Sequence, residues 1–186
     1  MKITLKRRGS GFTLIEALIT ISIASILASI AIPSFTKMIE SNRISSASND
    51  FLSALMFARS EAAKRSISVS ICTSNNGTSC NTSLNDYAAG WIIFTDCGDD
   101  GALSLAATSC DLDGDGTNDS DLLLRVQEEI SSTSIVATST AATDYFTYRF
   151  SGRPASPVGF KIGKDATETK KQIKVARTGR VRLESN

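Results

Sequence analysis

The chain lacks histidine altogether, and this removes the commonest general base and the commonest metal ligand of proteins. It also contains neither the G-x-S-x-G turn of serine hydrolases nor a G-x-x-x-x-G-K phosphate loop. Cysteine is scarce, with four residues in 186, no CxxC pair and no spacing typical of zinc sites. These absences argue against an enzyme, so we expect a binding or structural role without catalytic residues.

The first eleven residues contain no acid, although four of them are basic: Lys2, Lys6, Arg7 and Arg8. An apolar run of 21 residues follows at 12–32, which is long enough to cross a bilayer as a helix. In secretory signals a small-residue cleavage site follows a shorter apolar core, whereas here Gly-Ser-Gly at 9–11 precedes the run. We therefore expect the apolar helix to remain on the mature protein, with the basic end in the cytoplasm.

Glu16 is an unusual residue within this run, because a carboxylate inside a bilayer costs on the order of a few kcal/mol. The motif Gly11-Phe12-Thr13-Leu14-Ile15-Glu16 follows the basic residues and resembles the type III signal of type IV pilins and type II secretion pseudopilins. The resemblance implies cleavage after Gly11 by the prepilin peptidase and methylation of the new amine on Phe12. It further implies that Glu16 neutralises the terminal amine of a neighbouring subunit during assembly. The alternative is an interface-level Glu16 that snorkels to the lipid headgroups.

The same resemblance implies where the protein resides and what it contacts. The precursor would be a single-pass protein of the inner membrane, and the mature chain would belong to a pilus that spans the periplasm or extends outside the cell. Its partners would be other pilin subunits, the prepilin peptidase and the membrane. An exported domain meets an oxidising compartment, so we expect disulfides. Sequence order favours pairing of Cys72 with Cys80 and of Cys97 with Cys110, and the two other connectivities remain open.

The hydrophobic pattern changes its period after Arg65. Apolar residues at three- and four-residue steps, including Phe51, Leu55, Ala58 and Ala62, predict that the helix continues beyond Pro33 and packs on a sheet. Shorter apolar segments then predict strands at 67–71, 91–94, 122–126, 134–137, 145–150, 158–162, 173–176 and 180–183. The fold class is thus α+β, with one long helix packed on antiparallel β-sheets. We divide the chain into a cleaved leader (1–11), a transmembrane and filament-core helix (12–33), its amphipathic continuation (34–65) and a globular antiparallel β domain (66–186).

This order of elements is similar to that of the FimT/GspH minor pilins and pseudopilins. The resemblance lies in Ala58-Arg59-Ser60-Glu61-Ala62 on the helix and in a Gly90-Trp91 strand followed by Phe94 and Asp96. It covers most of the chain and is looser than the match of the leader. It implies the type IV pilin fold, in which the amino-terminal helix packs on two small antiparallel sheets.

Charge is segregated along the chain, although the overall net charge is only +1. Without the leader, 16 basic residues stand against 19 acidic ones, a net charge of −3. Residues 96–121 contain eight aspartates and no lysine or arginine. Alternating acids followed by glycine resemble the start of a calcium loop, and the candidate ligands are Asp111, Asp113, Asp115 and Asp119. Leu122 occupies the position of the final glutamate of such a loop, so an acidic turn beside a disulfide is the competing interpretation.

The carboxyl-terminal segment is basic, with ten lysines and arginines against three acids over 149–186. If 180–183 is a strand, Val181 and Leu183 point inward while Arg180 and Arg182 share the outer face, beyond a turn that Gly179 permits. Gly179-Arg180-Val181-Arg182 matches the GRxR pattern of FimT-type minor pilins, which bind DNA during natural transformation. The candidate DNA-binding residues are Lys170, Lys171, Lys174, Arg177, Gly179, Arg180 and Arg182.

Two readings of function follow. The chain is expected to be a minor type IV pilin that binds extracellular double-stranded DNA without sequence preference, because no recognition helix is evident. The alternative is a structural minor pilin that primes assembly, or a type II secretion pseudopilin, with no role in DNA binding. In that case the basic segment contacts a neighbouring subunit, or its charges guard an exposed strand edge against aggregation.

Overall fold

The computed structural model of the chain describes residues 12–106, 110–112, 114–138 and 144–185. Its longest element is the helix α1, Leu14–Arg65, which passes through Pro33 without interruption. Contacts between residues divide the chain into two units, Met1–Glu40 and Ser41–Asn186, and α1 contributes to both.

The first unit contains the amino-terminal part of α1. Thr13 caps the helix, because its hydroxyl accepts a bond from the Glu16 amide (3.3 Å) and donates one to the Glu16 carboxylate (3.5 Å). The bond from the Glu16 amide to the Thr13 hydroxyl is an N-terminal cap, and an acid in the first turn also suits the positive end of the helix dipole. Large apolar side chains such as Phe12, Leu14 and Ile30 are exposed along this segment. The helix is long and apolar enough to cross a membrane.

The polar side chains of this segment bond to the helix itself. Five hydroxyl groups each donate a hydrogen bond to a backbone carbonyl three or four residues earlier, at distances of 2.6–3.1 Å. They belong to Thr20, Ser22, Ser25, Ser29 and Thr36. Such bonds satisfy the donor inside the helix, so the hydroxyl needs no partner from another molecule.

The second unit begins with the remaining part of α1. The apolar stripe predicted from the sequence is confirmed, because Phe51, Leu55, Ala58 and Ala62 are all fully buried. Burial of such a stripe supplies most of the stability of an amphipathic helix. The helix ends at Arg65, and Ser66 then adopts a positive φ of 57°, the left-handed conformation that commonly terminates helices.

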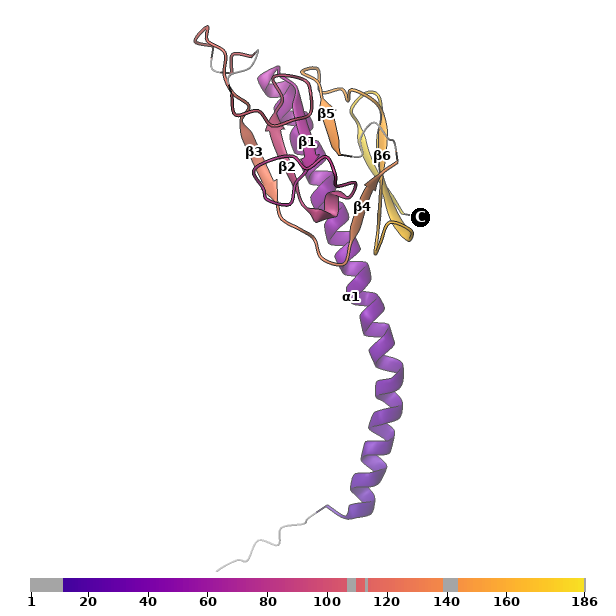
Figure 1. Cartoon of the computed structure of the whole chain (residues 1–186). Helices are drawn as coiled ribbons and strands as arrows, with labels where there is room; N and C mark the ends of the chain where they lie inside the picture. The colour runs from indigo at the N-terminus through magenta and orange to yellow at the C-terminus, as the bar shows by residue number, and fades with distance from the viewer. Residues whose placement is uncertain (1–11, 107–109, 113, 139–143, 186) are drawn as a thin grey trace, which may run out of the picture. The chain divides into compact units, whose positions relative to one another are not determined.

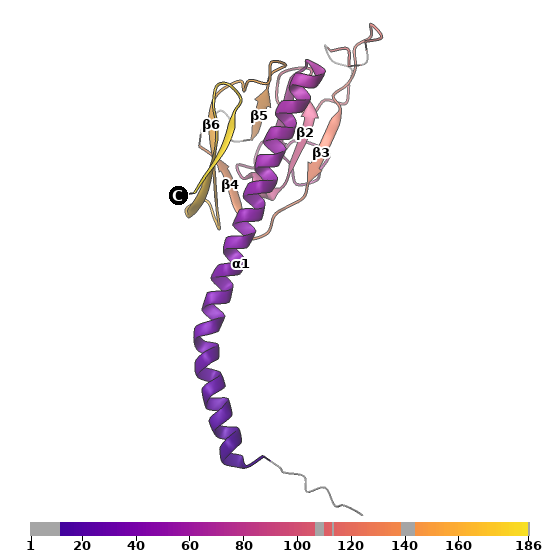
Figure 2. The same ribbon diagram turned by 180° about the vertical axis from the view of Figure 1, so that it is seen from behind.

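Two four-stranded antiparallel sheets pack with this part of α1 (Figures 1 and 2). The first has the order β3-β2-β1-β5 and the second the order β4-β6-β7-β8. The strands of the first sheet are β1 Val69–Thr73, β2 Trp91–Thr95, β3 Leu123–Gln127 and β5 Tyr145–Tyr148. Those of the second are β4 Ser134–Ala137, β6 Val158–Gly163, β7 Thr169–Val175 and β8 Val181–Ser185.

An aromatic cluster joins helix and sheets in one core. The ring of Phe51 on α1 lies 5.2 Å from Tyr87, 5.1 Å from Trp91 and 4.8 Å from Phe160, measured between ring centroids. Tyr87 belongs to the short 3-10 helix η1, Tyr87–Ala89, Trp91 to β2 and Phe160 to β6. Tilted and edge-on rings at these distances attract one another beyond their burial. This cluster therefore fixes the position of the second sheet against the helix within this unit.

All eight predicted strands exist, but several boundaries differ. β1 begins at Val69 and not at residue 67, because the turn at Ser66 still occupies the chain there. β5 ends at Tyr148, since Arg149 and Phe150 belong to the following turn. β7 begins at Thr169, four residues before the predicted start, because its first half is polar and carries no apolar alternation. The helix η1 was not predicted.

Candidate nucleic-acid interface

The outer face of the second sheet collects the basic side chains of β7 and β8. Ile173 and Val175 of β7 are buried, and Val181 and Leu183 of β8 pack against the core. The alternate residues, Lys174 and Arg182 among them, therefore point away from the core, as predicted. Lys174 is the register partner of both Arg182 and Gly159, so the two cations lie side by side across β7 and β8.

A shallow groove of about 670 Å³ runs along this face. Its lining includes Thr138, the three cations Lys174, Arg180 and Arg182, and the carboxylate of Glu184. Gly159 contributes no side chain, and a Cβ at this position would lie only 2.9 Å from the Thr138 hydroxyl. The groove thus exists because glycine occupies the centre of the sheet at that point.

The turn between β7 and β8 fixes the position of Arg180, which lines this groove. The Gly179 amide donates to the carbonyl of Ala176 (2.8 Å), and the Ala176 amide donates to the carbonyl of Arg180 (2.9 Å). Gly179 has a φ of 79°, and a Cβ there would lie 2.1 Å from the carbonyl oxygen of Gly152. Gly179 is buried and therefore shapes the turn without presenting a binding group.

The predicted basic residues do not all share this face. Lys171 lies on the opposite side of β7, where its amine donates to the Ser45 hydroxyl on α1 (3.0 Å). Its placement therefore differs from the prediction, because the alternation of β7 separates it from Lys174. Lys170 pairs with Glu168, and Lys174 pairs with Glu184 at 2.7 Å. Both pairs are about half exposed and so add little to stability.

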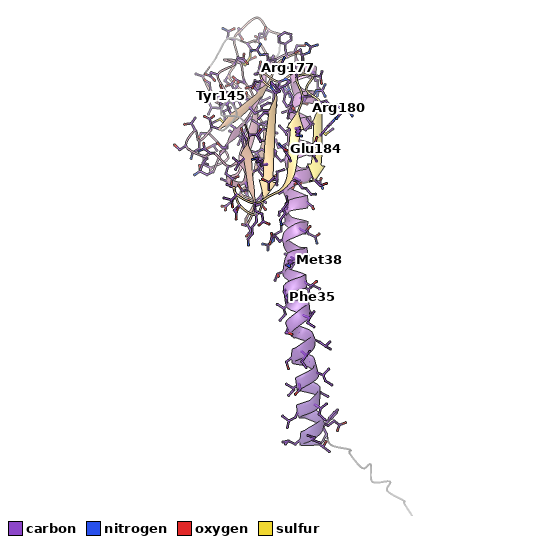
Figure 3. All side chains as sticks on the ribbon, turned by 90° about the vertical axis from the view of Figure 1, so that its right-hand side faces the viewer. Phe35, Met38, Tyr145, Arg177, Arg180 and Glu184 are labelled. Carbon is purple, nitrogen blue, oxygen red and sulfur yellow. A yellow bond between two sulfur atoms is a disulfide. The ribbon has the colours of Figure 1, made fainter. Side chains whose placement is uncertain are left out.

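The three arginines of the predicted site keep their charges available. Arg177, Arg180 and Arg182 are exposed, and none forms a salt bridge with a residue in the described part of the chain. Figure 3 shows Arg177, Arg180 and Glu184 on the carboxyl-terminal strands and their turn. Arg177 lines a neighbouring groove. Guanidinium groups bind phosphate through paired donors in a fixed plane, so this face is chemically suited to a phosphate backbone.

Arg59 on α1 is a site residue that the sequence analysis did not identify as such. Its Nε donates to the carbonyl of Gly152 and its Nη2 to the carbonyl of Thr178, both at 3.1 Å. It thereby ties the turn after β5 to the turn before β8. No local pattern could reveal this role, because its partners lie 93 and 119 residues away.

The residues of the predicted leader site are only partly described. Gly11 lies outside the described residues, and Phe12 is exposed. Glu16 is also exposed, and among the described residues its side chain bonds only to the Thr13 hydroxyl. The role of Glu16 toward a neighbouring subunit stays a prediction.

The acidic loop uses its carboxylates to bind its own backbone. Asp111 accepts bonds from the amides of Gly114 (2.6 Å) and Gly116 (2.9 Å), and Asp119 accepts one from Leu112 (2.7 Å). Asp115 accepts from Thr117. In the part of the chain that the structure describes, no group of three acidic or cysteine side chains is placed to hold a metal ion. Asp113 lies outside that part, so the calcium hypothesis stays a prediction.

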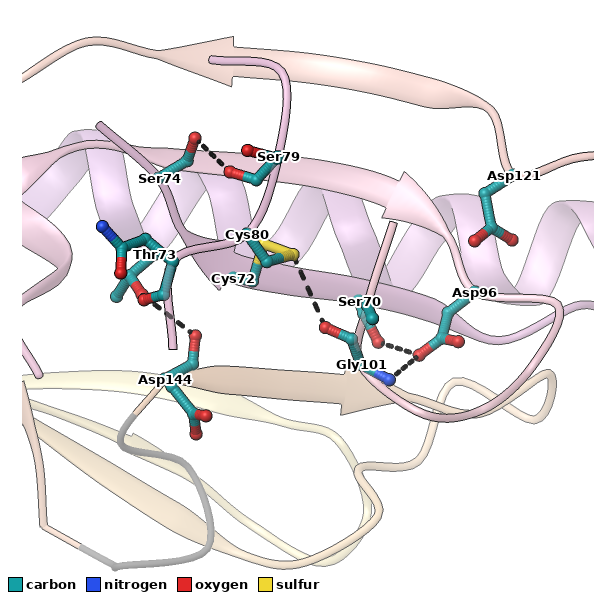
Figure 4. The surroundings of a disulfide bond; sticks show 12 residues. Ser70, Cys72, Thr73, Ser74, Ser79, Cys80, Asp96, Gly101, Asp121 and Asp144 are labelled. Atoms are coloured by element: carbon teal, nitrogen blue, oxygen red, sulfur yellow. Dashed lines mark hydrogen bonds between the residues drawn. A yellow bond between two sulfur atoms is a disulfide. The ribbon is translucent and has the colours of Figure 1, made fainter. Parts of the chain in front are cut away.

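Two disulfides join Cys72 to Cys80 and Cys97 to Cys110, which is the pairing that sequence order favoured. Figure 4 shows the first of them beside the buried carboxylate of Asp96, which accepts bonds from the Ser70 hydroxyl (2.6 Å) and the Gly101 amide (2.9 Å). Burial raises the pKa of Asp96 above its ordinary value of 3.8, although these hydrogen bonds oppose the shift. Both features brace the first sheet and lie apart from the basic groove.

A long apolar helix followed by two antiparallel sheets is the architecture of a type IV pilin subunit. Residues 6–32 match the family model of the prokaryotic N-terminal methylation motif. Residues 47–179, more than half of the chain, match the model of the Type II transport protein GspH. The chain therefore belongs to the GspH family of minor pilins and pseudopilins, and the sequence resemblance is confirmed.

The fold is similar to that of a solved minor pilin. The crystal structure of the type IV minor pilin FimU from Pseudomonas aeruginosa is similar with a TM-score of 0.53 and 19% identity, covering 79% of this chain and 92% of that one. The minor pseudopilin EpsH of the Vibrio cholerae type 2 secretion system has a TM-score of 0.44 and 12% identity, with 77% and 97% covered. No curated protein sequence matches the chain significantly.

Proposed function

We propose that this GspH-family subunit is a minor type IV pilin without catalytic activity, and that the outer face of its second sheet binds double-stranded DNA. The observation that supports the proposal most strongly is the groove that Lys174, Arg180 and Arg182 help to line. Two of these three cations have no salt bridge to a described residue, so their charges remain available for phosphates. Taking up DNA from outside the cell would then be the role of the pilus in which the subunit sits.

Binding is expected to be independent of sequence. A strand face with three long cations offers contacts to backbone phosphates, whereas reading bases in the major groove requires an inserted helix or ribbon. Each phosphate contact releases counterions, so the affinity falls steeply as salt is added. Competition between unrelated duplexes should therefore be equal, and salt should abolish binding.

A titration of labelled duplex DNA tests the proposal on the full chain in neutral detergent micelles. The Arg180→Ala, Arg182→Ala double variant should bind roughly tenfold or more weakly at low salt, with the slope of log affinity against log salt reduced by about two. The matched control is the Arg125→Ala, Lys164→Ala double variant. It removes two exposed cations from β3 and from the β6–β7 turn, outside the groove, and changes the net charge equally.

Equal loss in both double variants would show that only net charge matters and would contradict a defined groove. Absence of binding by the parent chain would leave the alternative, in which the basic face contacts a neighbouring subunit as in an assembly pilin or a secretion pseudopilin. The comparison of the double variants requires that each retains the circular dichroism spectrum and the melting temperature of the parent.

A further inference from the structure

A second basic groove of about 490 Å³ lies beside the first, and Pro157 lines both. Its basic residues are Arg149, Arg153 and Arg177, and no carboxylate contributes to its lining. None of the three guanidinium groups forms a salt bridge with another residue that the structure describes. Three like charges on one groove repel one another, and a bound anion offsets this repulsion.

The backbone holds this groove in shape through two turns. The Arg149 amide donates to the carbonyl of Arg153 (2.9 Å), and the Gly152 amide donates to the carbonyl of Arg149 (2.8 Å). Arg59 then bonds to Gly152 and, through the other end of its guanidinium, to Thr178. Because Arg177 precedes Thr178, this bridge keeps it next to the turn that carries Arg149 and Arg153.

Phe150 occupies the tip of the first turn and lines the same groove. The residue is 63% exposed, whereas every other phenylalanine beyond residue 60 in the described chain is buried. Exposed aromatic rings flanked by cations are the usual platform for unpaired bases, because every base can stack on the ring while its phosphates meet the charges. A phosphate alone would require only the arginines.

We propose that this second groove binds an unpaired nucleobase on Phe150, with the adjacent phosphates held by Arg149, Arg153 and Arg177. It would thereby give the subunit a preference for single strands or frayed duplex ends. The inference rests on the proposed function, since it assumes that DNA reaches this face of the subunit. It extends that function from the sheet face, which suits an intact backbone, to the turns at the end of the sheet, which suit an open strand.

The test compares a labelled oligothymidylate with a blunt duplex of equal length, titrated at low salt against the full chain in neutral detergent micelles. The Phe150→Leu variant keeps an apolar side chain but removes the stacking surface, and it should bind the oligothymidylate about tenfold more weakly. Its affinity for the duplex should change less than about twofold, because paired bases are not available to the ring. The Phe150→Tyr variant is the matched control and should retain the parent affinity for both.

The outcomes separate this inference from the proposed function. If the parent binds duplex and Phe150→Leu binds the oligothymidylate as tightly as the parent does, the stacking role is overturned and the sheet-face proposal survives. Equal weakening toward both DNAs would overturn it as well, because it would indicate a general disturbance of the turn. Binding of neither DNA by the parent would refute both proposals, whereas Phe150-dependent binding of the oligothymidylate alone would support the second groove and contradict duplex binding.

Discussion

Replacing Gly179 by alanine tests whether this residue of the GRxR segment acts through the backbone. Gly179 has a φ of 79°, a region that an L-residue with a Cβ enters at a cost of about 1–2 kcal/mol. The added Cβ would also lie 2.1 Å from the Gly152 carbonyl oxygen and 2.8 Å from Nε of Arg59. Since the nearer atom belongs to the backbone, one of the two turns must move.

The two effects together define the expected loss. Forced overpacking costs about 1–3 kcal/mol, so the sum with the conformational term is roughly 2–5 kcal/mol. Whole domains are stable by only about 5–15 kcal/mol. A unit of this size should therefore melt roughly 5–20 °C lower. The displaced turn also breaks the hydrogen bonds of Arg59, so DNA affinity should fall even at temperatures at which the variant is folded.

Gly116→Ala is the control for this experiment. Gly116 has a φ of 87°, yet no atom lies within 4 Å of its hypothetical Cβ. This variant carries only the conformational cost of about 1–2 kcal/mol and should leave DNA binding unchanged. Thermal unfolding followed by circular dichroism, combined with the duplex titration, measures both quantities. The reasoning is refuted if Gly179→Ala is destabilised no more than Gly116→Ala, or if it is destabilised but binds DNA normally while folded.

Three further expectations follow from single contacts. Glu184→Gln releases Lys174 and removes the carboxylate from the groove, so duplex affinity at low salt should rise roughly two- to fivefold, and unchanged affinity would contradict the groove as the binding site. Because burial raises the pKa of Asp96, the folded state holds its proton more tightly than the unfolded chain does, and this contribution to the unfolding free energy is lost as the pH rises through the folded pKa. Asp96→Asn removes this titration, so the unfolding free energy measured with urea should decline less with rising pH just above 3.8 in the variant than in the parent. Identical pH slopes in the two proteins would show that Asp96 does not cause the decline. The Glu16→Ala chain should be inserted and processed, but little of it should be found in filaments sheared from cells. Thr13→Val removes only the cap and should be incorporated normally. Equal incorporation of the two variants would refute the role assigned to Glu16.

Local pattern predicted the long helix and the eight strands, although not the helix η1. The stripe through Phe51 and Leu55 identified the buried face of α1, because a helix with such a stripe must cover it. Alternation placed Val181 inward and Arg182 outward on β8. Where apolar alternation was absent, in the first half of β7, that part of the strand was missed, since only its pairing with β6 defines it.

The candidate site was predictable only in part, because its geometry depends on contacts between distant segments. The GRxR segment pointed to Arg180 and Arg182, but nothing local to Lys171 shows that its amine reaches Ser45. The bridge from Arg59 to two separate turns is likewise a product of the tertiary fold. The second groove lies between turns that this bridge ties together, so it could not be inferred from spacing along the chain.

The hydroxyl groups of the amino-terminal part of α1 have a consequence for how a pilin subunit changes its surroundings. A subunit that leaves the bilayer for a filament exchanges lipid tails for the side chains of neighbouring helices. Because the hydroxyls of residues such as Ser22 and Ser25 stay bonded to their own helix, this exchange breaks no hydrogen bond and demands none from the new neighbours. The membrane and the filament then differ for this helix mainly in apolar packing, which has no directional preference. The hydroxyls therefore impose no preferred position on the helix among its neighbours, and the polar contact expected to fix that position is the one assigned to Glu16.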